Sequence, residues 1–136
     1  MEYRHYWKKR KLRHFLSMPF IYGMIIPLIF LDICLEIYHR VAFFFYKIDY
    51  IKRRKYIKID RQRLAYLTGI EKLNCMYCGY ANGLIHYASM IAAKTEYYWC
   101  GIKHEDSDKF HAPSYHDNFL PFNDQEKFKE YVKEDK

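Results

Sequence analysis

Three of the four cysteines and His104 fall within thirty residues, at spacings that suit metal coordination. Cys75 and Cys78 stand three positions apart and are followed by Gly79, which is typical of a tight turn that presents two thiolates to one cation. Cys100 and His104 supply a third and a fourth ligand. The pattern predicts a Cys3His site for zinc, with iron as the alternative metal, because both bind thiolate and imidazole ligands.

Other residues near this group could assist it. Glu71 and Glu96 flank the cysteines and could orient a ligand histidine by accepting its second N–H. His86, His111 and His116 are reserve ligands. A set of four protein ligands leaves no position for water, which favours a structural metal over hydrolysis. No other catalytic motif stands out, so the sequence leans against an enzyme without deciding the question.

One condition must hold before the site can close. Apolar residues recur at helical spacing from Leu84 to Tyr98, which predicts a helix between the two halves of the site. Such a helix is about 22 Å long at 1.5 Å per residue. Cys78 and Cys100 can then meet only if the residues before the helix run back along it, or if the helix is shorter than the pattern suggests.

Residues 15–31 form an apolar stretch with no charge over seventeen residues, near the lower limit for crossing a bilayer. Pro27 lies inside the stretch, and Asp32 and Glu36 interrupt its continuation. Residues 1–63 carry 15 Lys and Arg against 5 Asp and Glu, so both flanks of the stretch are basic. A single crossing should leave one flank poorer in cations, because positive charge marks the cytoplasmic side.

These features predict a membrane anchor over residues 15–46 that lies in the interface, or that enters the bilayer and returns with a bend near Pro27. A single span and a buried core helix are the alternatives. An anchor of this kind places both flanks at the cytoplasmic face of the membrane. The expected anchoring residues are Trp7, Phe15, Phe20, Ile21, Pro27, Leu31, Phe43, Phe44 and Phe45. The expected contacts with anionic lipid are Lys8, Lys9, Arg10, Lys11, Lys52, Arg53, Arg54 and Lys55.

The whole chain is expected to be mainly α. The predicted segments are a basic aromatic leader (1–14), the membrane anchor (15–46), a basic juxtamembrane segment (47–63), a helical Cys/His metal-binding module (64–105) and a polar tail (106–136). A short helix is expected over residues 60–67 with Asp60 as its N-cap, and a terminal helix over residues 124–133.

The sequence Cys75-Met-Tyr-Cys-Gly-Tyr80 resembles the metal-binding knuckle of rubredoxin-like and zinc-ribbon proteins, in which Cys-x2-Cys-Gly precedes an aromatic residue. Those families use a second Cys-x2-Cys where this chain has Cys100-x3-His104. The departure weakens what the resemblance implies about electron transfer by iron.

Three longer stretches, Pro19–Gly23, Ile37–Arg40 and Leu73–His104, resemble a family of small hypothetical bacterial proteins. The resemblance covers most of residues 15–105. It implies a bacterial setting and an anchor that forms one unit with the cysteine cluster, and it implies no activity.

Together these features predict a non-catalytic, membrane-associated zinc protein, an accessory or assembly subunit of a larger bacterial membrane complex. Its partners would be lipid and other membrane subunits, with no small-molecule substrate. A redox protein, using iron or a Cys75–Cys78 thiol–disulfide couple, is the alternative. A nucleic-acid-binding zinc module is less favoured, because the basic residues flank the apolar stretch and not the knuckle.

Overall fold

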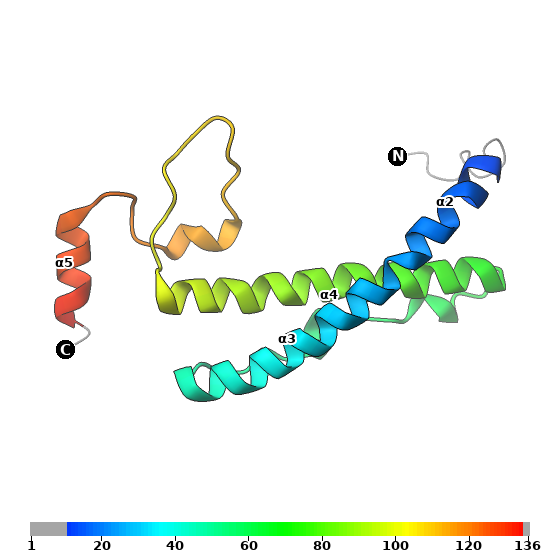
Figure 1. Cartoon of the computed structure of the whole chain (residues 1–136), viewed down its shortest axis with the longest axis horizontal. Coiled ribbons are helices and arrows are strands. Elements are labelled where there is room, and N and C mark those ends of the chain that lie inside the picture. Colours follow the sequence, from blue (N-terminus) through cyan, green and yellow to red (C-terminus); the bar gives the residue numbers. More distant parts are fainter. Residues whose placement is uncertain (1–10, 135–136) are drawn as a thin grey trace.

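The computed structural model describes residues 11–134, which fold into helices without any named strand in that range (Figure 1). The expectation of a mainly α fold is confirmed. The helices are α2 (Lys11–Gly23), α3 (Ile25–Tyr46), α4 (Gly69–Trp99) and α5 (Gln125–Glu134), and 3-10 helices cover Arg53–Lys55, Arg61–Arg63 and Ser114–Asn118. Most of the predicted leader lies outside the described residues, including Trp7, Lys8, Lys9 and Arg10.

α2 and α3 follow one another as an apolar rod that is interrupted near Gly23 and Met24. Pro27 has no amide hydrogen to donate to the carbonyl of Gly23, which weakens the helical ladder one turn before the proline. Residues 15–46 are nevertheless long and apolar enough to cross a membrane, the one such helix found in the described part of the chain. This observation rests on length and composition alone.

α4 is a single helix of 31 residues that starts well before the expected residue 84. Thr68 and Glu71 form a capping box, in which the Thr68 side chain accepts from the Glu71 amide and the Glu71 carboxylate accepts from the Thr68 amide at 2.8 Å. The helix predicted over residues 60–67 shrinks to the 3-10 helix Arg61–Arg63. Asp60 makes no capping hydrogen bond and pairs with Lys58 at 3.1 Å.

α3 and α4 lie side by side and run in the same direction, so the residues between them must travel back along the pair. Side-chain contacts advance in step along α4 and along α2 and α3: Tyr22 of α2 bonds Asn74, and in α3 Asp32 bonds Tyr80, Tyr38 bonds Thr95 and Tyr46 stacks on Tyr98. In Figure 1 both helices run from right to left. We call residues 47–68 the return segment.

The hydrophobic core lies where α3, α4 and the return segment meet. Its fully buried members are Phe43, Leu84, Tyr87 and Ile91, and Tyr56 and Ile57 of the return segment pack against them. Phe43 is only 1% exposed, so the prediction that it anchors the chain in lipid is wrong.

The remaining anchoring residues that the structure describes are exposed. They are Phe15, Phe20, Ile21, Pro27, Leu31, Phe44 and Phe45. Their side chains lie on the outside of the rod, where they are open to contact with lipid or with a protein partner.

A charged cluster holds the return segment to the middle of α3. The guanidinium of Arg53 forms a bidentate ion pair with Asp32, with Nη2 to Oδ2 at 2.6 Å, and Nη1 donates to Glu36 at 3.2 Å. The Tyr80 hydroxyl donates to Asp32 at 2.8 Å. Arg53 was expected to contact lipid headgroups; it is instead engaged inside the fold, because two carboxylates of α3 need a partner. Lys52, Arg54 and Lys55 are exposed.

Candidate metal centre

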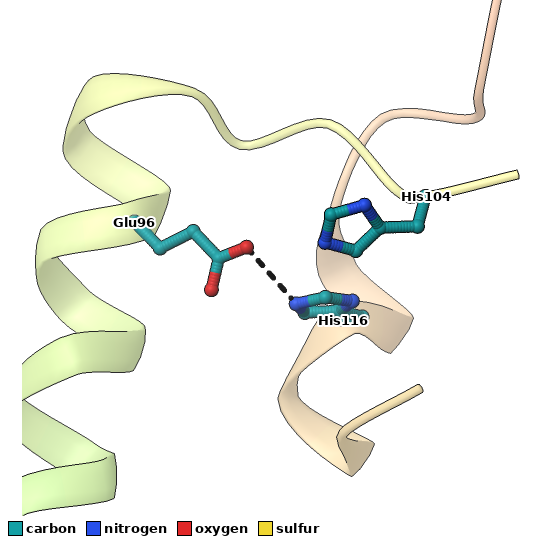
Figure 2. A group of neighbouring side chains, drawn as sticks. All are labelled: Glu96, His104 and His116. Carbon is teal, nitrogen blue, oxygen red and sulfur yellow. Dashed lines mark ion pairs between the residues drawn. The ribbon is translucent and has the colours of Figure 1, made fainter. Parts of the chain in front are cut away.

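A group of three potential metal ligands forms where α4 ends and the polar tail folds back. Glu96 projects from the last turn of α4, His104 lies on the segment that follows, and His116 lies in the 3-10 helix Ser114–Asn118. Figure 2 shows the three side chains pointing toward one another from these separate parts of the chain.

The backbone that brings them together begins at Gly101. This residue adopts φ +59°, a left-handed conformation that glycine reaches without steric cost, and it ends α4 with its amide bonded to the Glu96 carbonyl at 3.0 Å. The chain then pairs with residues near position 120 in a short parallel bridge. Lys103 N–H donates to the Leu120 carbonyl and Leu120 N–H donates to the Gly101 carbonyl, each at 2.8 Å.

Aromatic packing fixes His116 beside the end of α4. Phe119 is buried and stacks on the His116 ring with centroids 4.7 Å apart, and it also contacts Tyr97 of α4 at 5.7 Å. The His104 ring lies 5.5 Å from the His116 ring. Because helix, bridge and ring contacts hold the three donors in place, their proximity does not depend on one flexible side chain.

The chemistry of the group follows from the state of His116. Its side chain is 4% exposed, and among the described residues Nε2 forms an ion pair with Glu96 that lacks hydrogen-bond geometry, while Nδ1 has no hydrogen-bond partner. Nε2 lies 3.2 Å from Oε1 of Glu96, and one donor atom from each of Glu96, His104 and His116 lies within 4.8 Å of the others. A buried imidazole without hydrogen bonds is costly, and a metal ion would satisfy it.

Tyr115 positions the carboxylate of Glu96. Its hydroxyl donates to Oε2 at 3.2 Å, which leaves Oε1 facing His116. Burial, and then the Glu96 carboxylate, raise the pKa of Tyr115, which favours the protonated phenol that donates to this carboxylate. A carboxylate held by such a donor is the kind of support that metal ligands commonly have.

The three donors fit a zinc ion. Two imidazoles and one carboxylate are a known zinc set, with bonds of about 2.0–2.2 Å and a fourth position filled from elsewhere. Around a tetrahedral ion the ligand atoms lie about 3.3 Å apart, so the donors need to close by about 1.5 Å or less. His104 is exposed and can make this movement without disturbing the core. The same set also suits ferrous iron.

The predicted Cys3His site is not assembled, and this is the main correction to the sequence analysis. Cys75 and Cys78 lie inside α4 and not in a turn, and Cys100 follows at its far end. At 1.5 Å per residue, Cys75 and Cys100 are about 37 Å apart. Only His104 of the four predicted ligands joins the observed group, and all four cysteines are free thiols.

Three other expectations about this region also change. Gly79 has helical backbone and serves close packing, because a Cβ there would lie 3.1 Å from the Lys58 carbonyl oxygen. Glu71 caps the start of α4 and cannot orient a ligand at the other end. Cys75 and Cys78 lie beyond the first turn of α4 and not at the helix start that the thiol–disulfide alternative requires, so that alternative gains no support.

His116 is the ligand that sequence reasoning ranked too low. It stood among the reserve histidines because a polar loop rich in histidine can hold such residues for other reasons. The available signal was Gly101 followed by an aromatic, histidine-rich segment, which is typical of a chain that turns back on the helix it has just left.

No protein-family model, no curated protein and no solved structure matches this chain.

Proposed function

We propose that this chain is a membrane-associated metal-binding protein in which zinc is held by Glu96, His104 and His116. The observation that carries the proposal is the buried His116 ring, which faces a carboxylate and a second imidazole: Nε2 forms an ion pair with Glu96, and neither nitrogen has a hydrogen bond among the described residues. Zinc would satisfy it and cancel the cost of burying it. Iron is the competing metal, since two histidines and a carboxylate also bind ferrous iron.

The metal's role in this proposal is structural. The three ligands come from α4, from the segment after it and from the 3-10 helix Ser114–Asn118. A bound ion would therefore fasten residues 101–119 to the end of α4, and its binding free energy would add to the stability of that region. The fourth position would be filled by water or by a side chain of another subunit.

Membrane association is supported by the apolar rod of α2 and α3. Residues 15–46 have a mean hydropathy of 2.1 over their most apolar window, and only 6% of that window is buried inside the fold. A soluble protein rarely leaves so large an apolar surface uncovered. We place the protein at the cytoplasmic face of a bacterial inner membrane, as an accessory or assembly subunit of a larger complex.

Two measurements on one preparation test this function. Membranes from expressing cells are washed with high salt and with alkaline carbonate, and the protein is expected to stay with the membrane after the salt wash. The protein is then purified in mild detergent, and its metal content is determined by elemental analysis. Release by salt would contradict the membrane assignment, and absence of stoichiometric zinc or iron would contradict the metal assignment.

A further inference from the structure

The outer face of α3 is apolar along its whole length. Opposite the side that packs on α4 lie Ile26, Phe30, Ile33, Ile37, Val41 and Phe44, each more than half exposed. Their spacing of three and four residues keeps them on one stripe. The same exposure continues onto α2 at Phe15 and Phe20, which are 72% and 79% exposed.

The opposite face of α3 is already occupied: it contributes Phe43 to the core, and its polar residues are bonded to other parts of the fold. Asp32 and Glu36 bind Arg53 of the return segment, and His39 accepts from the amide of Ile51 at 3.1 Å. Tyr87 of α4 bonds both Glu36 and His39. α3 therefore has an apolar side that faces outward and an inner side, partly polar and partly apolar, that packs against the rest of the fold.

The path of the return segment restricts how α3 can be oriented in a bilayer. It runs back beside α3 without long helices, and the 3-10 helix Arg53–Lys55 lies level with the middle of α3, where Asp32 stands. If α3 crossed the bilayer, irregular backbone and the exposed Arg54 and Lys55 would lie near its centre. Backbone of this kind is not tolerated against lipid tails, and each such cation opposes insertion.

From this arrangement we infer that α2 and α3 lie flat in the headgroup region of an anionic bilayer, with the apolar stripe in lipid and α4 on the water side. The inference rests on the membrane association proposed above and names its partner and orientation. Exposed cations near both ends of the rod, Arg13 and Lys47, complement anionic headgroups. A flat helix also explains a rod of 32 residues, about 48 Å long, where a perpendicular crossing of the hydrocarbon core needs about 30 Å.

A matched pair of variants tests which face binds lipid. Ile37 on the stripe and Ile85 on α4 are 60% and 52% exposed. The full-length protein is mixed with preformed vesicles of phosphatidylcholine containing phosphatidylglycerol, and binding is measured by flotation. Ile37→Glu is expected to weaken binding about tenfold or more, and Ile85→Glu to leave it unchanged. Helix content and bound metal are measured in both variants, so that a folding defect is not mistaken for lost binding.

A depth profile tests the orientation. Tryptophan is placed at Ile26, Ile33 or Phe44 in a background with Trp7 and Trp99 changed to Phe, and quenching by lipids brominated at different depths is recorded. A flat helix gives the same shallow depth at all three positions. A deep middle position with shallow ends would overturn the flat orientation while leaving membrane association intact. Failure of the unaltered protein to bind any vesicle would overturn both.

Discussion

The backbone of Tyr56 lies directly against Gly83: a Cβ on Gly83 would come within 2.7 Å of the Tyr56 carbonyl oxygen and 2.9 Å of the Cα of Ile57. Gly79, one turn earlier, stands 3.1 Å from the Lys58 carbonyl by the same measure. The two glycines thus form a shallow channel along α4 in which the return segment lies. This close contact with α4 holds the return segment beside α3.

Replacing Gly83 with alanine is expected to destabilise the protein by about 1–3 kcal/mol, because backbone atoms on the other side of the contact cannot rotate out of the way. Gly69→Ala is the matched control, since nothing lies within 4 Å of the added methyl group and alanine favours a helix. Chemical unfolding in mild detergent measures both. Equal stability of the two variants would contradict the close packing.

Removal of the Arg53 guanidinium is expected to cost about 1–3 kcal/mol, because the carboxylates of Asp32 and Glu36 lose their charged donor. We expect a loss of stability in the lower half of this range, because the Arg53 side chain is 36% exposed and solvent weakens its ion pair with Asp32. Arg53→Met is compared with Arg54→Met, an exposed neighbour whose loss should change stability by less than about 0.5 kcal/mol. If Arg53→Met lost as little stability as Arg54→Met, the charged cluster would not be what holds the return segment.

The protein should lose stability in strong alkali through Tyr87. Burial, and then the Glu36 carboxylate, raise the pKa of Tyr87 to about 12, above the ordinary value of 10.0. Because the folded state keeps this proton longer than the unfolded chain, the contribution is fully present below pH 10 and is lost as pH rises toward 12. Tyr87→Phe should flatten the fall in unfolding free energy over this range. An unchanged slope in the variant would contradict the assignment.

The helical class of the protein was predictable because periodicity and capping signals are local. The apolar rod and the terminal helix, expected at 124–133 and found at Gln125–Glu134, depend only on nearby residues. The length of α4 was missed because Cys75–Gly79 was interpreted as a metal-binding turn, so the helix was expected to begin only at Leu84. Gly79 and Gly83 are accommodated by the return segment, a contact between distant parts of the chain that no local pattern reveals.

The candidate site was predictable by residue type but not by grouping. Glu96, His104 and His116 were all noticed in the sequence. The prediction nevertheless included Cys75 and Cys78, which lie near the start of α4, far from the group at its end. Their spacing matches a metal knuckle, and in a continuous helix the same spacing merely places two small side chains near one another. Only the path of the tail after Gly101 brings His116 to Glu96.

The most direct test of the metal centre is zinc content measured in parallel on three detergent-purified proteins: the unaltered chain, His116→Ala, and Cys75→Ser combined with Cys78→Ser. We predict about one zinc per chain in the unaltered protein and in the cysteine variant, and loss of zinc in His116→Ala. The reason is that His116 lies beside Glu96 and His104, whereas Cys75 and Cys78 do not belong to this group. Zinc retained by His116→Ala, or lost when the two cysteines are replaced, would contradict the account.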